Sequence, residues 1–253
     1  MELKSSAKLN IGLHVHNLRS DGFHNISTLF QEINLFDSIK IDEAETFSCK
    51  TSCGNISEAD NFGTKAFKIV KKQNPSIPNV SILINKNIPT NAGLGGGSSN
   101  GTAVLKGLNS FFDLSIDNGN LTSMAQEISS DSTFFIDGGM QFGTQRGEKL
   151  ESVENIEIPK HILLVHPDIK ISTKTAFEQL KNHLLNENMD INLSKLLREL
   201  KNNNFNSKLF KNDFEMYVFE THPEIGAIKL RILDLGAKYA SLSGTGSTVF
   251  GIF

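Results

Sequence analysis

Several features that usually direct a first interpretation are scarce in this chain of 253 residues. It has no tryptophan and only two cysteines, Cys49 and Cys53, which lie in one polar stretch without a second pair to complete a zinc site. The formal net charge is −3, so the chain has no general basic field to attract nucleic acid or an anionic membrane. We therefore expect neither as a partner, and any site for an anion must be built locally.

Long apolar segments are also missing. No run of about 18 apolar residues could span a bilayer, and the first residues, MELKSSAKLNIGL, lack the apolar core of a signal peptide. We therefore expect a cytoplasmic protein. Its length and 38% hydrophobic content suffice for two ordinary domains, and the polar, acidic stretch 151–159 is the expected junction.

Periodicity predicts several strands. Alternation from Leu9 to Val15 predicts a half-buried strand whose polar face carries Lys8, Asn10, His14 and His16. The two histidines could suggest a metal, but no third ligand has suitable spacing, and a metal site is not favoured. The other expected strands are 33–41, 80–85, a buried strand at 161–167, a hairpin over 133–144 and two short strands around the last glycine turn.

Helical spacing of apolar residues predicts the helices. One is expected after Asp60 or Asn61, either of which could be its N-cap, and another after the glycines at 93–97, capped by Ser98 or Ser99. Thr173 is expected to cap a helix that carries Phe177, Leu180 and Leu184. The remaining predicted helices lie around residues 121–128, 193–201, 212–220 and 223–235.

The most unusual segment is GLGGGSS at 93–99. Four glycines in five positions lose much backbone freedom on folding, which is costly unless something must approach the main chain closely. They precede a predicted helix, where unpaired N–H groups and the helix dipole favour phosphate. A tight turn packed against a neighbour is the alternative, but it needs only one or two glycines. Neither common phosphate motif fits, because no lysine follows the glycines and Ser98 replaces the last glycine of GxGxxG.

Four segments, in order along the chain, resemble those of the GHMP kinases, named for galacto-, homoserine, mevalonate and phosphomevalonate kinases. They are SAKLNIGLHV at 6–15, RSDGFH at 19–24, PTNAGLGGGSSN at 89–100 and LSGTGSTVFG at 242–251. The form GLGGGSSN is particularly similar to the branch that uses ATP to phosphorylate the 2-hydroxyl of 4-diphosphocytidyl-2-C-methyl-D-erythritol, in the non-mevalonate route to isoprenoid precursors.

The resemblance implies an α+β, two-domain GHMP kinase fold with the active site in the cleft between the domains. Residues 1–152 would form an α/β domain like domain 2 of ribosomal protein S5, and residues 153–253 a ferredoxin-like domain. Relatives usually continue for about another helix and strand after the last glycine motif. The second domain is therefore expected to be shortened at its end, either naturally or because the sequence stops early.

The resemblance also implies two catalytic residues. Lys8 would lie beside the attacking hydroxyl and stabilise its developing charge, although a lone lysine on a strand is usually just solvated. Asp131 aligns with the aspartate of the family's Gly-Ala-Asp-Val-Pro segment, read as the base that accepts the hydroxyl proton. From its spacing alone, capping a helix or closing a turn is the commoner role for an aspartate that follows two serines. Here Ser129 and Ser130 replace the Gly-Ala pair, and Thr133 replaces the proline.

Binding residues are carried over from the family in the same way. The implied co-substrate is ATP with Mg²⁺, and the implied nucleotide-binding residues are Pro89, Ala92, Gly93, Leu94, Gly95, Gly96, Gly97, Ser98, Ser99, Asn61 and Lys86. Ser98 or Ser99 could contact Mg²⁺, but no acidic ligand can be chosen from sequence. The implied substrate-binding residues are Asn10, Phe23, His24, Thr173 and Phe177.

Phe23 and His24 would stack on and hydrogen-bond a cytosine. Tyrosine is often found at the position of Phe23, but stacking needs the ring rather than the hydroxyl. Phe177 would cover the other face of the base, although its helical period fits a core position equally well. Partners would be small molecules only, with the chain a monomer or a weak homodimer. Two rivals remain: a homoserine or mevalonate type of GHMP kinase, and a non-catalytic nucleotide-binding regulator of the same fold.

Overall fold

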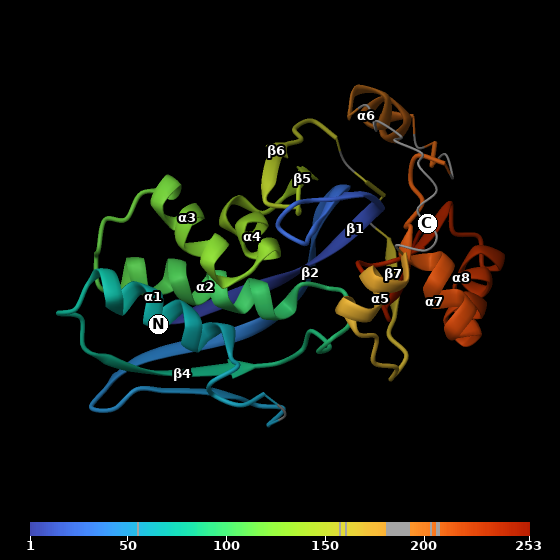
Figure 1. Cartoon of the computed structure of the whole chain (residues 1–253). Helices are drawn as coiled ribbons and strands as arrows, with labels where there is room; N and C mark the ends of the chain where they lie inside the picture. The colour runs from blue at the N-terminus through green and yellow to red at the C-terminus, as the bar shows by residue number, and fades with distance from the viewer. Residues whose placement is uncertain (55, 157, 160, 181–192, 203, 206–207) are drawn as a thin grey trace. The chain divides into compact units, whose positions relative to one another are not determined.

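The computed structural model describes residues 1–54, 56–156, 158–159, 161–180, 193–202, 204–205 and 208–253 (Figure 1). The chain divides into two units. The first unit consists of Met1–Lys8, Glu32–Thr90 and Gly95–Gly138, and the second of Leu9–Gln31, Asn91–Leu94 and Gly139–Phe253. The long strands β1 (Glu2–Leu18) and β2 (His24–Ala44) pair with each other and contribute a segment to each unit. The predicted domain boundary at residues 152 and 153 stays a prediction.

In the first unit, helices cover one face of a sheet (Figure 1). The strand order is β3 (Ser48–Thr51), β4 (Asn79–Asn85) and β2, with β3 parallel and β2 antiparallel to β4. The helices are α1 (Phe62–Gln73), α2 (Gly96–Phe111) and α3 (Asn118–Ile128). Ile41 and Ile82, partners across the sheet, share an apolar core with Val104 and Leu108 of α2. The predicted strand at 80–85 and the helix around 121–128 are confirmed.

The helix starts explain how the glycine cluster is presented. Asn61, rather than Asp60, caps α1, because its Oδ1 accepts from the backbone N–H of Gly63 at 2.8 Å. The N-cap of α2 is Gly95, which has a φ of 69°. The prediction that Ser98 or Ser99 caps α2 is therefore wrong. The left-handed backbone at Gly95 turns the chain into the helix early, and both serines lie within its first turn.

The predicted hairpin at 133–144 is also wrong. Thr133 ends a short 3₁₀ helix, η1 (Ser130–Thr133), and is followed by α4 (Phe134–Asp137). Only the second half of the predicted hairpin is a strand, β5 (Met140–Thr144). Phe134, Phe135 and Ile136 are all buried, and a short continuous apolar run does not distinguish a strand from a helical turn.

In the second unit, two sets of antiparallel strands are present. β2 pairs with β5, which pairs with β6 (Lys149–Ser152). The other set has the order β7 (Ile162–Val165), β9 (Val249–Ile252), β8 (Tyr239–Leu242), which confirms the predicted pair of strands around the last glycine turn. The strand predicted at 161–167 is confirmed as β7, but the prediction that it is buried is wrong, because β7 is an edge strand with Leu163 38% exposed.

The described helices of the second unit are α5 (Thr173–Leu180), α6 (Leu193–Lys201), α7 (Phe214–Thr221) and α8 (Pro223–Asp234). Thr173 is the first residue of α5 rather than its cap, because the hydroxyl of Ser172 accepts from the N–H of Thr175 at 3.2 Å. Leu184, predicted to continue this helix, lies outside the described residues. In the described part of the chain, no helix combines the length and the apolar character needed to cross a membrane.

The polar face of β1 departs from its prediction. Lys8, Asn10 and His14 are each at most 3% exposed, so only His16 behaves as the expected half-buried strand requires. The buried groups are satisfied by partners: the amide of Asn10 donates to the hydroxyl of Thr28 at 3.0 Å, and Nε2 of His14 lies 2.9 Å from the carbonyl oxygen of Leu209. Burial lowers the pKa of His14.

Candidate active site

The amino terminus of α2 is built around two lysines of the first unit. The stem of Lys8 lies against Gly95, where an added Cβ would be 3.0 Å from Cγ of Lys8 and 3.0 Å from the ring of Phe135. At Gly96, an added Cβ would be 2.9 Å from Ile88 and 3.3 Å from Nζ of Lys86. Both glycines are therefore needed so that the main chain can approach these side chains. The result is a helix amino terminus, whose unpaired N–H groups and dipole favour an anion, beside two lysines that are each paired with an aspartate.

Lys8 and Asp131 form an ion pair in this unit. Nζ of Lys8 lies 3.4 Å from Oδ2 of Asp131, which stands on η1. The lysine side chain is 4% exposed and the aspartate 35%. A carboxylate that reaches solvent beside a buried cation can accept a proton from a bound hydroxyl, while the cation stabilises the charge left on oxygen.

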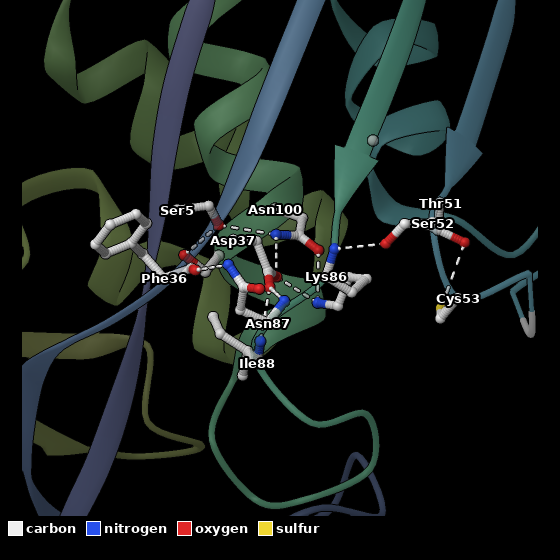
Figure 2. A network of polar contacts seen from close by, with 12 residues as sticks. Ser5, Phe36, Asp37, Thr51, Ser52, Cys53, Lys86, Asn87, Ile88 and Asn100 are labelled. Atoms are coloured by element: carbon white, nitrogen blue, oxygen red, sulfur yellow. Dashed lines mark hydrogen bonds and ion pairs between the residues drawn. The ribbon is translucent and has the colours of Figure 1, made fainter.

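A second lysine–aspartate pair has different surroundings (Figure 2). Asp37 of β2 is fully buried, and its Oδ1 accepts from the backbone N–H groups of Asn87 at 2.7 Å and Ile88 at 2.8 Å. Its Oδ2 accepts from the amide of Asn100 at 2.8 Å and from Nζ of Lys86. Asp37 thus holds both Lys86 and the segment that leads into the glycine cluster.

The same network reaches the first turn of α2. Asn100 also accepts from Nζ of Lys86 at 3.0 Å and donates to the hydroxyl of Ser5 at 2.9 Å. The hydroxyl of Ser5 in turn donates to Ser99 at 2.8 Å. Ser99 is therefore bonded on the interior side of the helix and is 2% exposed, so Ser98, at 9%, is the more accessible of the two serines considered for Mg²⁺.

The other glycines of the cluster differ in what requires them. Gly93, in the second unit, has a φ of 75°, and an added Cβ would be 1.9 Å from the carbonyl oxygen of Ser243. The hydroxyl of Ser243 donates to the carbonyl of Gly93 at 3.0 Å, so this glycine serves the contact with the last glycine motif. Gly97 is different, because an added Cβ would make only an ordinary contact, 3.5 Å from Phe62. Nothing within the described chain requires glycine at position 97.

Aromatic side chains gather elsewhere in the second unit. The rings of His24 and Phe177 are stacked, with centroids 5.5 Å apart at 18°, and Phe177 meets Phe214 edge to face at 4.8 Å. Phe23 is 53% exposed, and the guanidinium of Arg146 lies 5.0 Å from its ring centre. Phe177 thus packs on the core cluster of this unit, as its helical period predicts, and also stacks on His24. Its contact with a base stays a prediction.

The predicted site residues therefore fall into two groups. Lys8, Asp131, Gly95, Gly96 and Lys86 come together at the start of α2, with Gly97 and Ser98 in its first turn. Asn61 lies at the start of α1, where its oxygen is used in capping. The second unit holds Asn10, Phe23, His24, Thr173 and Phe177, together with Ala92, Gly93 and Leu94. Pro89 precedes the cluster in the first unit.

Three residues of these regions were missed by sequence reasoning. Asp37 stands among alternating apolar residues of a strand, and Arg146 in a polar turn, so neither had a distinguishing signal. Thr245, whose hydroxyl lies 3.1 Å from that of Thr173, could have been noted because it stands within the last glycine motif.

The described residues include no group of three or more histidine, cysteine, aspartate or glutamate side chains able to hold a metal ion. Mg²⁺ in nucleotide sites is bound by one or two protein oxygens plus the substrate phosphates, so such a group is not required. Ser98 offers one hydroxyl oxygen in the first turn of α2. His14 and His16 are bonded separately, His16 through Nε2 to the hydroxyl of Ser27 at 2.9 Å.

Comparison with known proteins places this architecture. The family model for the GHMP kinases N terminal domain matches residues 61–139, and that for GHMP kinases C terminal matches residues 178–253. A 4-diphosphocytidyl-2-C-methyl-D-erythritol kinase of Chlorobium phaeobacteroides is 33% identical over 100% of this chain and 86% of its own length. The protein of the same name from Bacteroides fragilis is 35% identical over 98% of this chain and 90% of its own.

Solved structures agree with these matches. A 4-(cytidine 5'-diphospho)-2C-methyl-D-erythritol kinase superposes with a TM-score of 0.85 and 26% identity, covering 100% of this chain and 90% of that one. A homoserine kinase from Cytophaga hutchinsonii, 18% identical over 100% of this chain and 85% of its own, has a TM-score of 0.69 and shows the fold alone. The predicted α+β GHMP kinase fold is confirmed. The chain belongs to the 4-diphosphocytidyl-2-C-methyl-D-erythritol kinase family of the GHMP kinases.

Proposed function

We propose that this protein transfers the γ-phosphoryl group of ATP to the 2-hydroxyl of 4-diphosphocytidyl-2-C-methyl-D-erythritol, a step toward isoprenoid precursors. The observation that carries the proposal is the pairing of Lys8 with Asp131 beside the amino terminus of α2. This arrangement brings a base, a cation and a phosphate-binding helix end together within one unit. The relatives' names supply the alcohol, and the chain's own residues supply the chemistry.

The reaction would begin when the carboxylate of Asp131 accepts the proton of the substrate hydroxyl. The freed oxygen attacks the γ-phosphorus, a new O–P bond forms, and the bond from that phosphorus to the β-γ bridging oxygen breaks to release ADP. Lys8 stabilises the negative charge on the attacking oxygen while the proton leaves. Transfer is direct, and positioning and charge neutralisation supply most of the rate.

Phosphate binding would use residues 93–99. The first backbone N–H groups of α2 have no partner within the helix, so they are available to the phosphates. Gly97 supports this role, because the fold itself does not require a glycine there. Mg²⁺ would be held mainly by ATP phosphate oxygens with the hydroxyl of Ser98, and it would neutralise phosphate charge.

Recognition of the cytosine would use the aromatic residues of the second unit. The stacked rings of His24 and Phe177 provide a planar surface, and Phe23 is exposed beside Arg146. Asn10 and Thr173 would contribute polar contacts to the substrate. A planar aromatic surface suits a nucleobase better than it suits homoserine or mevalonate, which have no ring.

The test is an ADP-release assay with purified protein, ATP, Mg²⁺ and three acceptors assayed separately: 4-diphosphocytidyl-2-C-methyl-D-erythritol, homoserine and mevalonate. We expect turnover with the first acceptor and none above background with the other two. Turnover that prefers homoserine or mevalonate would replace the proposed substrate. ATP binding without turnover on any of the three would support a non-catalytic regulator instead.

A further inference from the structure

The segment that carries Asp131 is fastened to α2 by hydroxyl groups. This part of the chain reads Ser129-Ser130-Asp131-Ser132-Thr133, whereas the resembled family segment is Gly-Ala-Asp-Val-Pro. Four hydroxyl side chains thus replace residues that have none. Because these groups surround the expected base, their bonding decides how firmly its carboxylate is held.

Ser129 is the centre of this bonding. Its hydroxyl donates to the hydroxyl of Ser98 at 2.8 Å and lies 2.7 Å from that of Ser132. One hydroxyl has a single proton, so when Ser129 gives its proton to Ser98, a bond between Ser129 and Ser132 uses the proton of Ser132. The same Ser132 hydroxyl also lies 3.4 Å from the carbonyl oxygen of Ser98. The three serines therefore connect η1 to the first turn of α2, with Ser129 in the shortest contacts.

Further bonds keep the two elements together. The hydroxyl of Thr102 in α2 donates to the carbonyl of Ser132 in η1 at 2.8 Å. Within η1, the hydroxyl of Thr133 donates to the carbonyl of Ser130 at 3.1 Å. The backbone N–H of Ser129 also bonds the end of α3, through the carbonyl of Ala125 at 3.2 Å. Ser129 therefore joins α3, η1 and α2 two residues before Asp131.

We propose that Ser129 is a positioning residue for phosphoryl transfer, whose hydroxyl fixes η1 on α2 so that Asp131 stays opposite Lys8. The inference rests on the proposed kinase function and extends it to a residue that the family pattern does not supply. Ser132 is fully buried and Ser98 is 9% exposed, so water competes poorly for these bonds. Loss of the central hydroxyl leaves only the longer contact of 3.4 Å from Ser132 to the carbonyl of Ser98.

The experiment compares kcat and the KM for ATP in five proteins: wild type, Ser129→Ala, Ser129→Thr, Ser130→Ala and Asp131→Asn, each checked for an unchanged thermal midpoint. Ser130→Ala is the matched control, because it deletes a hydroxyl at the residue adjoining Asp131. Misplacing a reacting group by a fraction of an ångström is costly, so we expect Ser129→Ala to lower kcat about tenfold with the KM for ATP within about twofold. Ser129→Thr should restore most of the rate, and Ser130→Ala should match wild type.

A double variant separates positioning from general damage. When Ser129→Ala is added to Asp131→Asn, we expect no further loss of kcat, because the group that Ser129 positions is already gone. An additional tenfold loss in that background would overturn the inference, as would equal losses in Ser129→Ala and Ser130→Ala. A higher KM for ATP with unchanged kcat would place the effect on α2 and would also overturn it.

The ratio of variant to wild-type kcat is measured on whichever of the three acceptors the wild type phosphorylates. A different preferred acceptor therefore refutes the proposed substrate and still tests Ser129. If the wild type turns over none of the three acceptors, both the kinase proposal and this inference are refuted. If Ser129→Ala is poorly folded, the thermal midpoint shows it, and Ser129→Cys, whose thiol is only a weak hydrogen-bond partner, replaces it in the single and double variants with the same expected losses and the same overturning results.

Discussion

The two lysine–aspartate pairs of the first unit have the same chemistry and opposite surroundings. Asp37 and Lys86 are both almost fully buried, and the carboxylate accepts from four donors. Asp131 is 35% exposed, 3.4 Å from a buried Lys8. A carboxylate whose two oxygens accept from donors on every side organises the chain around it. A carboxylate with an open side can exchange a proton with a ligand. The comparison predicts that exposure of the acid, rather than the pairing, separates a structural ion pair from one that can take part in a reaction.

The largest expected effect comes from Asp131→Asn. We expect kcat to fall about 1000-fold, because a positioned general base contributes between 100-fold and 10,000-fold to such a step. The free energy of unfolding should change by less than about 1 kcal/mol, because the pair is partly solvated. The ADP-release assay and urea unfolding measure the two quantities. Asp137→Asn, at a nearby exposed aspartate, is the control, and turnover equal to wild type in Asp131→Asn would remove this residue from the mechanism.

The opposite outcome is expected from Asp37→Ala. Removing one partner of a buried pair leaves an uncompensated charge, so the free energy of unfolding of the first unit should fall by about 3 kcal/mol. Urea unfolding followed by circular dichroism measures the change. Asp42→Ala is the matched control in the same strand, because Asp42 and Lys40 form an exposed pair that should contribute less than about 1 kcal/mol. Equal losses in the two variants would contradict the distinction.

A third prediction extends the comparison to the second unit, where Phe177 has both a packing role and a stacking role. Phe177→Leu keeps apolar volume and removes the ring, so we expect the KM for the cytidyl substrate to rise about tenfold from lost aromatic stacking. Phe177→Tyr keeps the ring and should remain close to wild type. The KM for ATP should stay constant in both variants, and steady-state kinetics measure both KM values. An unchanged substrate KM in Phe177→Leu would leave Phe177 as a core residue only.

The smallest expected effect separates two neighbouring glycines. Gly97→Ala meets no clash, and alanine is favoured over glycine inside a helix by about 0.5–1 kcal/mol, so stability should be equal or higher. The KM for ATP should nevertheless rise several-fold, because the added methyl group would lie where phosphate approaches.

Gly96→Ala is the companion variant, and its Cβ would press on Ile88 at 2.9 Å. It should lower the thermal midpoint, since Ile88 and Lys86 must both move. An unchanged KM for ATP in Gly97→Ala would show that the phosphates do not approach this part of the cluster.

Local patterns were sufficient for most regular elements. Helical spacing at Leu121, Met124, Ala125 and Ile128 predicted α3, and the Ile- and Val-rich run at 80–85 predicted β4. The pattern failed where it was ambiguous. The apolar run at 134–136 fits a strand or a helical turn. The two serines after the glycines are good N-cap residues, so they were preferred over Gly95, which is the actual N-cap of α2.

Burial could not be deduced in the same way. Lys8, Asn10 and His14 alternate with apolar residues exactly as a solvated strand face does, and the sequence does not show which distant groups will satisfy them. The burial of β7 was misjudged for a related reason. Its edge position follows from its pairing with β9, which lies more than 80 residues later in the chain.

The sequence alone was enough to place the glycine cluster at the start of a helix, and the order of four motifs was enough to indicate a GHMP kinase. These features are local, so a short stretch of sequence is enough to recognise them. Three interactions join residues far apart in sequence. They are the ion pair of Lys8 with Asp131, the ion pair of Lys86 with Asp37, and the hydrogen bond between Ser129 of the segment before Asp131 and Ser98 of α2. Such contacts depend on how strands and helices pack around a shared core. The same packing separates Gly95 and Gly96, where an added Cβ would be crowded, from Gly97, where it would not.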